Sequence, residues 1–346
     1  MAHKLAFIGF GGVGQGLVDI LLDRSDWLRD KFGTEFQVVS ITDLYKGSIH
    51  HNDGLDIQQA RKLVKETGSL NDYPESEGLV KGWDSLTTIQ NTNADTIIEI
   101  TYTDVFTGQP AIKHCEEAFK NKKNVVVTNK GPVALALDEL EELAKQNGVR
   151  FLYEGTVMSG TPALRMPLTS LIGNHITSIR GILNGTTNYM FMRMEEGLSY
   201  EEALKEAQEK GYAEADPTSD VEGFDVLYKV IILAKVVMGE SLTKDEVNRT
   251  GMASVTERDL NEAAEEGKKW KMIGRLEKTE QGLTASVAPE KVDEEDPLAG
   301  ISGATNAVTY ECDLSGPVTL IGAGAGIPET GFALLIDLLN LDRDNQ

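Results

Sequence analysis

The chain has 346 residues and a formal net charge of −22, which limit its architecture and its partners. A length of this order favours two domains. The acidic balance leaves no basic stripe to neutralise phosphates, which excludes nucleic acid as a partner. Two cysteines are too few for a disulfide framework or a zinc site, and no segment is typical of a membrane helix or a cleavable signal. We therefore expect a cytoplasmic protein without membrane contact.

The first motif lies at the start of the chain, where a short apolar strand runs into a glycine turn and then a helix. Gly9, Gly11 and Gly14 fit the pattern G-x-G-x-x-G. Glycine is required because the turn is tight, the backbone must approach a pyrophosphate, and the helix must pack closely on its strand. Between a strand and a helix, the pattern predicts a dinucleotide-binding loop, although a glycine turn without ligand is the alternative. The loop comprises Gly9, Phe10, Gly11, Gly12, Val13 and Gly14.

The next apolar run, residues 35–43, predicts a strand that ends at Asp43. An acidic residue at this position accepts hydrogen bonds from the adenosine ribose and disfavours a 2′-phosphate. Lys46, His50 and His51 follow closely and bear on the same choice. The sequence therefore leaves NAD and NADP open as cofactors, with a preference for NAD.

Two further apolar runs, residues 94–104 and 123–131, predict strands on either side of a helix from Gln109 to Asn121. Both end in polar residues, at the edge where an open parallel sheet binds its ligands. This position indicates Thr101 and Lys130 as site residues, whereas a lysine that only caps a loop is the alternative for Lys130. These elements predict an α/β fold with a Rossmann-type nucleotide-binding domain.

The composition changes after Gly155, and a strand followed by a polar turn at residues 184–188 leads into a helix. Amides and hydroxyls at a helix N-terminus suit a substrate carboxylate, which points to Gly185 and Thr186. An ordinary N-cap explains the same residues equally well.

The segment from Val221 to Met238 predicts a buried helix, because its residues are apolar at almost every angle. Helical spacing places Glu222, Asp225 and Lys229 on one face and Lys235 elsewhere. A salt bridge on a solvated stripe is the simplest explanation of such a pair. Burial of the helix favours a functional site instead, because buried Lys and Asp are rare unless they are paired.

Four segments together resemble the homoserine dehydrogenase family over nearly the whole chain: GFGGVGQG, VVTNKGP, GILNGTTNY and, with the most specific spacing, GYAEADPTSDVEGFDVLYK. The resemblance implies NAD(P)H-dependent reduction of L-aspartate 4-semialdehyde to L-homoserine, on the route to threonine, methionine and isoleucine. It also implies a homodimer. The expected organisation is a Rossmann domain (1–154) rejoined by a C-terminal helix (327–346), with a second α+β domain for catalysis and dimerisation (155–326).

Carried over to this sequence, the resemblance implies that Lys229 is the catalytic lysine, with Asp225 as its partner. Glu214 is the expected carboxylate for the substrate's ammonium. Lys130 matches a lysine between cofactor and substrate, and Gly326 matches a position near the nicotinamide. As hydride reaches the aldehyde carbon, negative charge grows on the carbonyl oxygen, and an ammonium can stabilise that charge and donate a proton. Asp225 would keep the ammonium charged in a buried site.

The family also binds a monovalent cation, usually sodium, through a glutamate and mainly backbone oxygens. The implied ligands are Glu154, Val157, Ser159 and Thr161, in a segment less rich in glycine than the family pattern. Longer members add an ACT domain after the last helix. The sequence stops at that point, so we expect no dedicated threonine-feedback module.

Two alternatives to this function remain open. One is another semialdehyde or amino-acid dehydrogenase on the same scaffold. Aspartate-semialdehyde dehydrogenase would need a nucleophilic cysteine with a histidine, and neither Cys115 nor Cys312 lies in a suitable turn. The other is a non-catalytic nucleotide-sensing regulator, which has no need to retain Glu214, Asp225 and Lys229 together with Lys130.

Overall fold

The computed structural model describes residues 2–104 and 106–343, and the chain divides into two compact units. The first unit contains residues 1–160 and 326–346, and the second contains residues 161–325. The predicted boundary between residues 154 and 155 lies inside the first unit. Residues 344–346 of the predicted C-terminal helix lie outside the described residues.

The first unit is built on a seven-stranded sheet with the order β4-β3-β2-β1-β5-β6-β7. Its strands are β1 (His3–Ile8), β2 (Phe36–Asp43), β3 (Gly47–His50), β4 (Val80–Lys81), β5 (Thr96–Glu99), β6 (Asn124–Val127) and β7 (Phe151–Leu152). Pairing is parallel from β2 through β7, and β3 and β4 add an antiparallel edge. Strands β2, β3 and β4 follow β1 on one side of the sheet, and β5, β6 and β7 then follow on the other side. The strand order therefore reverses beside β1. A Rossmann sheet binds its dinucleotide at this reversal.

Strand β5 is shorter than the predicted run to residue 104. Ile100 still donates its amide to Ile8, but the carbonyls of Thr101 and Tyr102 accept from the side chain of Asn129 instead of from a strand. Thr101 therefore lies in the loop after β5.

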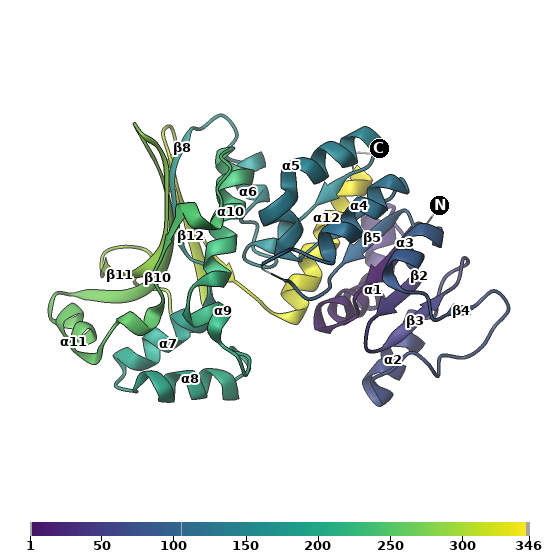
Figure 1. Cartoon of the computed structure of the whole chain (residues 1–346), viewed down its shortest axis with the longest axis horizontal. Helices are drawn as coiled ribbons and strands as arrows, with labels where there is room; N and C mark the ends of the chain where they lie inside the picture. Colours follow the sequence, from purple (N-terminus) through teal and green to yellow (C-terminus); the bar gives the residue numbers. More distant parts are fainter. Residues whose placement is uncertain (1, 105, 344–346) are drawn as a thin grey trace. The chain divides into compact units, whose positions relative to one another are not determined.

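Helices lie around this sheet (Figure 1). They are α1 (Gly12–Phe32), α2 (Ile57–Thr67), α3 (Ser85–Asn91), α4 (Ala111–Lys120), α5 (Lys130–Asn147) and α12 (Ile327–Arg343), with a short 3₁₀ helix η1 (Glu154–Thr156). The predicted apolar side of α1 is confirmed, because Leu17 and Leu21 are buried and Val13 and Ile20 pack against the same core.

Helix α12, near the end of the chain, packs directly on α1, near its beginning (Figure 1). Glycine makes this close approach possible. A Cβ added at Gly16 would lie 2.7 Å from the carbonyl oxygen of Ile327, and one added at Gly331 would lie 2.9 Å from the amide nitrogen of Leu17. The last helix of the chain therefore completes the first unit.

The second unit is built on a six-stranded sheet with the order β13-β12-β8-β10-β11-β9. Its strands are β8 (Ile176–Ile182), β9 (Val247–Arg249), β10 (Lys268–Thr279), β11 (Gly282–Asp293), β12 (Thr305–Cys312) and β13 (Gly316–Ala323). All neighbours are antiparallel except β9 and β11. The helices are α6 (Arg165–Thr169), α7 (Gly185–Glu195), α8 (Tyr200–Glu209), α9 (Thr218–Val221), α10 (Phe224–Met238), α11 (Glu257–Glu265) and two 3₁₀ helices, η2 (Lys244–Glu246) and η3 (Met252–Ser254).

The predicted continuous helix from Val221 to Met238 is wrong at its start. Gly223 has φ +78°, which breaks the chain into α9 and α10. Glu222 consequently ends α9 instead of sharing a face with Asp225, and its carboxylate lies 3.6 Å from the guanidinium of Arg249. The predicted burial of the remaining helix is correct, since residues 226–234 are all buried.

None of the helices in residues 2–104 and 106–343 is long and apolar enough to cross a membrane.

Candidate active site

The glycine loop of the first unit has the geometry that a dinucleotide-binding turn requires. Gly9 has φ +93°, and a Cβ there would lie 2.7 Å from the carbonyl oxygen of Ile100. A Cβ at Gly14 would lie 2.6 Å from the Ile100 side chain, so this glycine lets α1 pack closely on the sheet. At Gly11, a Cβ would meet nothing within 4 Å, which leaves this backbone open to approach. Glycine thus has a different physical role at each of these three positions.

The other predicted loop residues pack inward and leave mainly their backbone for a ligand. Phe10 is fully buried and contacts Phe7 edge to face, with ring centroids 5.9 Å apart. Val13 packs against the core of the unit, and a Cβ at Gly12 would lie 3.1 Å from the Ile327 side chain.

Gly326, the predicted glycine near the nicotinamide, immediately precedes α12 in the first unit. It has φ +132°, and a Cβ there would lie 2.0 Å from a carboxylate oxygen of Glu329. Only glycine fits this position without displacing Glu329.

Asp43 ends β2 as predicted, and its carboxylate binds the glycine loop itself. Oδ2 accepts from the amide of Phe10 (2.8 Å), and Oδ1 accepts from the amides of Tyr45 and Lys46 (both 3.0 Å). Burial by itself raises the pKa of Asp43, but these backbone hydrogen bonds and the Lys46 ammonium outweigh it and lower the pKa. Asp43 is therefore a stable negative charge beside the loop.

Of the three basic residues that bear on cofactor choice, only Lys46 reaches Asp43, with Nζ 3.6 Å from Oδ2. His50 pairs with Ser40, three positions before Asp43 on β2, and stacks on Trp83 with ring centroids 4.6 Å apart. His51 bonds through Nε2 to the carbonyl of Glu77 (2.9 Å). Of these three residues, Lys46 is therefore the one whose positive charge lies next to Asp43.

Thr101 and Lys130 are linked by Asn129, which the sequence reasoning missed. Asn129 caps α5 by accepting from the amide of Gly131 (3.0 Å), and its amide group donates to the carbonyls of Thr101 (3.2 Å) and Tyr102 (3.1 Å). Lys130 follows as the first residue of α5 and is half-buried. An asparagine directly before a helix is an N-cap signal that could have identified this link.

In the second unit, Lys229 is held by two hydrogen bonds. Its side chain is 7% exposed, and Nζ donates to the carbonyl of Leu183 (2.6 Å) and to Oδ2 of Asp225 (2.7 Å). The predicted pair one helical turn apart is therefore present and buried. An ammonium has three donors, and no residue in the described part of the chain accepts the third.

Asn184 connects this pair to the start of α7, and it too was missed as a site residue. Its amide group donates to Oδ2 of Asp225 (3.0 Å) and to Oδ1 of Asp220 (2.7 Å), while its oxygen caps the amide of Thr187 (2.9 Å). One side chain thus orients the carboxylate beside Lys229 and fixes the helix start.

Gly185 and Thr186, the predicted carboxylate-binding residues, open α7 next to Asn184. A Cβ at Gly185 would lie 2.5 Å from the carbonyl of Ala304, and the Thr186 hydroxyl donates to the carbonyl of Tyr212 (2.6 Å). The hydroxyl is therefore already engaged. The first amides of a helix have no intrahelical acceptor, so the backbone remains the group suited to an anion.

Glu214 lies apart from this network. It is exposed on the loop between α8 and α9, and its carboxylate makes no hydrogen bond or ion pair with any residue that the structure describes. The carboxylates around Lys229 are instead Asp225 and, through Asn184, Asp220.

The residues implied as cation ligands divide between the two units. Glu154 is buried in η1, and its amide donates to the buried carboxylate of Asp337 (2.9 Å). Val157 is fully buried, and Ser159 adopts φ +54° while its hydroxyl bonds to Thr330 (2.8 Å). Thr161 belongs to the second unit.

This segment has features that suit a monovalent cation. Two consecutive non-glycine residues, Met158 and Ser159, have positive φ and are buried, and such strained backbone is typical of functional segments. A buried carboxylate, as in Glu154, is the hard oxygen donor that such ions prefer.

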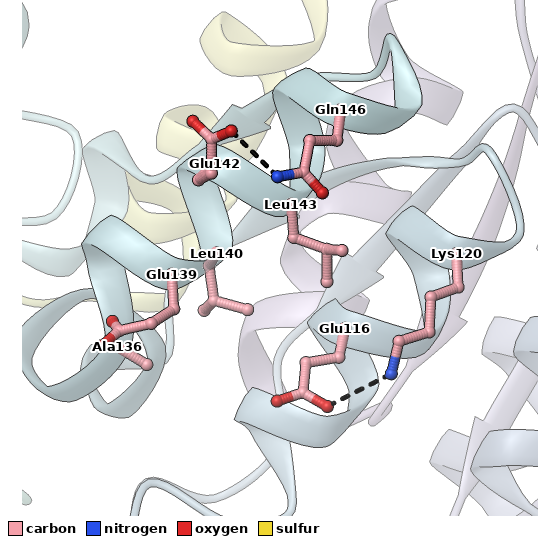
Figure 2. A pocket seen from close by; sticks show the side chains of 8 residues that line it. All are labelled: Glu116, Lys120, Ala136, Glu139, Leu140, Glu142, Leu143 and Gln146. Atoms are coloured by element: carbon pink, nitrogen blue, oxygen red, sulfur yellow. Dashed lines mark hydrogen bonds and ion pairs between the residues drawn. The ribbon is translucent and has the colours of Figure 1, made fainter.

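A surface pocket of about 350 Å³ lies between α4 and α5 and contains none of the predicted site residues (Figure 2). Four of its polar groups form two pairs: Glu116 with Lys120 (3.5 Å) and Glu142 with Gln146 (2.9 Å). Ordinary helix-surface pairs of this kind do not indicate catalysis.

Known proteins match both units. A family model for the NAD binding domain of homoserine dehydrogenase matches residues 9–154, and one for homoserine dehydrogenase matches residues 162–339. The chain is 42% identical over 340 residues to an NAD(+)-dependent homoserine dehydrogenase of Pseudomonas canavaninivorans, covering 98% of this chain and 96% of that protein. It is 41% identical to a homoserine dehydrogenase of Methanocaldococcus jannaschii, covering 97% and 98%.

The chain belongs to the homoserine dehydrogenase family.

Solved structures agree. A putative homoserine dehydrogenase from Archaeoglobus fulgidus has a TM-score of 0.87 at 35% identity and covers 98% of this chain and 99% of its own. A hyperthermophilic archaeal homoserine dehydrogenase in complex with NADPH has a TM-score of 0.85 at 28% identity, covering 99% and 98%. The predicted fold, family and class of enzyme are confirmed: the chain is an NAD(P)-dependent oxidoreductase that acts on a CH–OH group.

A buried lysine of the second unit was not anticipated from the sequence. Lys271 on β10 is 2% exposed, and its Nζ donates to the carbonyl of Ile301 (2.6 Å) and to the side chain of Asn188 (3.1 Å). Asn188 in turn donates to the carbonyls of Gly303 (3.0 Å) and Thr305 (3.2 Å). Together they hold the loop at residues 301–305 against α7, where Gly185 begins the helix.

We predict that Lys271 makes stability depend on alkaline pH. Burial lowers the pKa of Lys271 from 10.5 to about 8, against the smaller opposing effect of Glu195. Between these pH values the unfolded chain holds a proton that the folded chain has released, so the free energy of unfolding rises with pH, by at most about 1.4 kcal/mol per pH unit.

Denaturant titrations at several pH values from 7 to 10.5 measure this dependence, with Lys271→Met as the comparison. The difference between the two proteins isolates Lys271 from other groups that titrate in the same range. Parallel stability curves for wild type and Lys271→Met would show that the lysine stays charged throughout.

Proposed function

We propose that this chain catalyses the reversible NAD(P)H-dependent reduction of L-aspartate 4-semialdehyde to L-homoserine, with Lys229 as the proton donor. The observation that carries the proposal is the buried Lys229 ammonium between Asp225 and the Leu183 carbonyl. Membership of the homoserine dehydrogenase family supplies the reaction class.

The chemistry follows from charge. The nicotinamide nucleotide, when bound, supplies the hydride that reduces the aldehyde. Lys229 stabilises the negative charge that develops on the aldehyde oxygen and gives that oxygen a proton through its third N–H. Asp225 compensates the ammonium in its buried surroundings, and Asn184 holds Asp225 in place.

Other groups bind and orient the reactants. The backbone at Gly185 and Thr186 holds the substrate carboxylate, and Glu214 holds its ammonium. In the first unit, the glycine loop binds the pyrophosphate, and Thr101, Lys130 and Gly326 serve the nicotinamide end. An exposed Glu214 without partners is consistent with a carboxylate that pairs only when the substrate is bound.

The cofactor proposal favours NAD over NADP. Asp43 carries a stabilised negative charge at the end of β2, where it would bind the ribose and repel a 2′-phosphate. Lys46 is the residue that opposes this preference, because its ammonium lies 3.6 Å from the same carboxylate.

A monovalent cation at Glu154, Val157, Ser159 and Thr161 is part of the same proposal. The residues would bind it through the Glu154 carboxylate and backbone oxygens, and its charge would stabilise the strained segment that joins the two units. A sodium titration at constant ionic strength that left the thermal unfolding temperature unchanged would contradict this site.

We also propose a homodimer located in the cytoplasm. Leu314 and Ile172 are 78% and 79% exposed on adjoining turns of the second unit, which are linked by the bond from the Ser315 amide to Asn174 (3.0 Å). Exposed apolar groups that gather in this way are typical of interfaces. Both cysteines are free and buried, as suits a reducing compartment. Light scattering that returned the mass of a single chain would contradict the dimer.

The first prediction from the proposed function concerns Lys229. Lys229→Ala should lower kcat by about 10²- to 10⁴-fold, because the reaction loses its proton donor. Lys235→Ala is the matched control, since Lys235 lies on the same helix and bonds to Ser241 (2.8 Å). Steady-state rates and NADH binding are measured for both. A Lys229→Ala enzyme with near-wild-type kcat would rule out the proton-donor role.

A second prediction concerns Glu214. Glu214→Ala should raise KM for aspartate semialdehyde by about 10-fold with a smaller change in kcat, because a charged hydrogen bond to the substrate is lost. Glu209→Ala, at the end of α8, serves as the control for a simple change in surface charge. An unchanged KM would mean that Glu214 binds no ammonium.

Cofactor preference gives a third prediction. Initial rates with NADH and NADPH should favour NADH. Lys46→Ala should strengthen this preference by about 10-fold, because the cation nearest to a 2′-phosphate is removed. Asp43→Asn should weaken it. A Lys46→Ala enzyme with an unchanged ratio of kcat/KM values would show that this lysine does not affect the choice.

A further inference from the structure

A buried glutamate lies at the end of β5, directly beneath the loop that carries Thr101. Glu99 is fully buried and pairs with Ile8 of β1 and Val127 of β6 in the middle of the parallel sheet. Burying a carboxylate is costly unless its oxygens are well bonded. Its presence at the ligand-binding edge of the sheet therefore requires a reason.

The Glu99 carboxylate uses only one of its oxygens. Oε1 accepts a short hydrogen bond from the Thr101 hydroxyl and a second from Nδ1 of His114 (3.2 Å). His114 lies on α4 and is 4% exposed. Oε2 is buried and has no partner among residues 2–104 and 106–343. The Glu99 carboxylate is therefore only partly hydrogen-bonded. This lowers the stability of the protein relative to an apolar residue of the same size.

These contacts determine the direction of the Thr101 hydroxyl. The Thr101 hydroxyl donates its proton to Oε1 of Glu99. The lone pairs of Thr101 Oγ1 then remain for a donor. The side-chain amide of Asn129 lies 3.4 Å from Oγ1 and makes a closer bond to the Thr101 carbonyl at 3.2 Å. Thr101 is half-buried, so its hydroxyl oxygen can be reached by a ligand.

We propose that Glu99 and His114 are a positioning pair that makes Thr101 Oγ1 a hydrogen-bond acceptor for the carboxamide N–H of the bound nicotinamide. This inference rests on the proposed cofactor role of Thr101. Strand β5 adjoins β1 on the side away from β2, and Asp43 at the end of β2 marks the ribose of the adenosine half. The nicotinamide half therefore extends toward β5 and Thr101.

The pair also explains why His114 faces the sheet. Nδ1 of His114 lies 3.2 Å from Oε1, and this contact restrains the carboxylate beside Thr101. His114 and Glu99 act on the cofactor only through Thr101, which makes them positioning residues and not catalytic ones.

Three substitutions of Glu99 separate the effects of its hydrogen-bonding reach, its charge and its side-chain volume. Glu99→Gln keeps an oxygen within reach of Thr101, Glu99→Asp keeps the charge but shortens the side chain, and Glu99→Met keeps the volume without an acceptor. The dissociation constant of NADH, measured by fluorescence titration of the full-length protein, should rise by about 10-fold for Asp and Met and by less than about 3-fold for Gln. If Glu99→Met does not fold, Glu99→Asp provides the same test.

A double-mutant cycle with Thr101→Val shows whether Glu99 acts through Thr101. Thr101→Val alone should weaken NADH binding by about 10-fold, and adding Glu99→Asp or Glu99→Met to it should cause no further loss. If the Glu99 substitutions act through a general loss of structure, they will weaken NADH binding further in the Thr101→Val background as well. That result would overturn the proposal.

An NADH analogue that carries an acetyl group in place of the carboxamide provides an independent readout. The acetyl group has no N–H, so wild type should prefer NADH over the analogue, and Thr101→Val and Glu99→Met should lose that preference. An unchanged preference in both variants would overturn the inference.

The cycle also separates this inference from the proposed function. Unchanged NADH binding by Thr101→Val would show that Thr101 has no cofactor role. Weaker binding by Thr101→Val, together with wild-type binding by Glu99→Asp and Glu99→Met, would leave the cofactor role intact and disprove the positioning pair.

Discussion

The hydrogen bonds that hold the Lys229 ammonium are the interaction on which the second unit depends. A buried lysine is stable only where acceptors are already in place, and here they come from two different elements: Leu183 at the end of β8 and Asp225 on α10. Helix α10 must therefore start at a fixed position along the sheet. The break at Gly223 sets that start and separates α10 from α9.

Asparagine side chains join the elements of both units at the point where a helix begins. Asn184 caps α7 and holds Asp225 with Asp220, and Asn129 caps α5 and holds the loop that carries Thr101. An amide can donate and accept at once, so one side chain can cap the start of a helix and orient a neighbouring group. In this chain, two residues that cap helix starts also hold Asp225 and the Thr101 loop.

Several buried ionisable groups lower the stability of the protein. Glu99 leaves one oxygen unpaired, and Lys271 has a pKa lowered to about 8 by burial. Apolar residues of similar size would avoid these costs. Both groups instead orient short segments: the Thr101 loop in the first unit and residues 301–305 in the second. Stability is lost at these positions and conformational specificity is gained.

Local sequence patterns were enough to predict several elements of this chain. Glycine spacing identified the dinucleotide loop, apolar runs identified β1 and β2 with Asp43 at its end, and a four-residue interval identified Asp225 with Lys229. These signals depend on neighbours along the chain, and the family resemblance rested on the same short segments. Only the tertiary structure decided the partners that are distant in sequence: the Leu183 carbonyl for Lys229, Asn184 for Asp225, and His114 for Glu99. It also placed α12 on α1, and it removed Glu222 from the predicted face because Gly223 adopts a left-handed conformation (φ +78°) between α9 and α10. The physical reason is the same in each case, because hydrogen bonding and close packing depend on separation in space, which local sequence patterns do not contain.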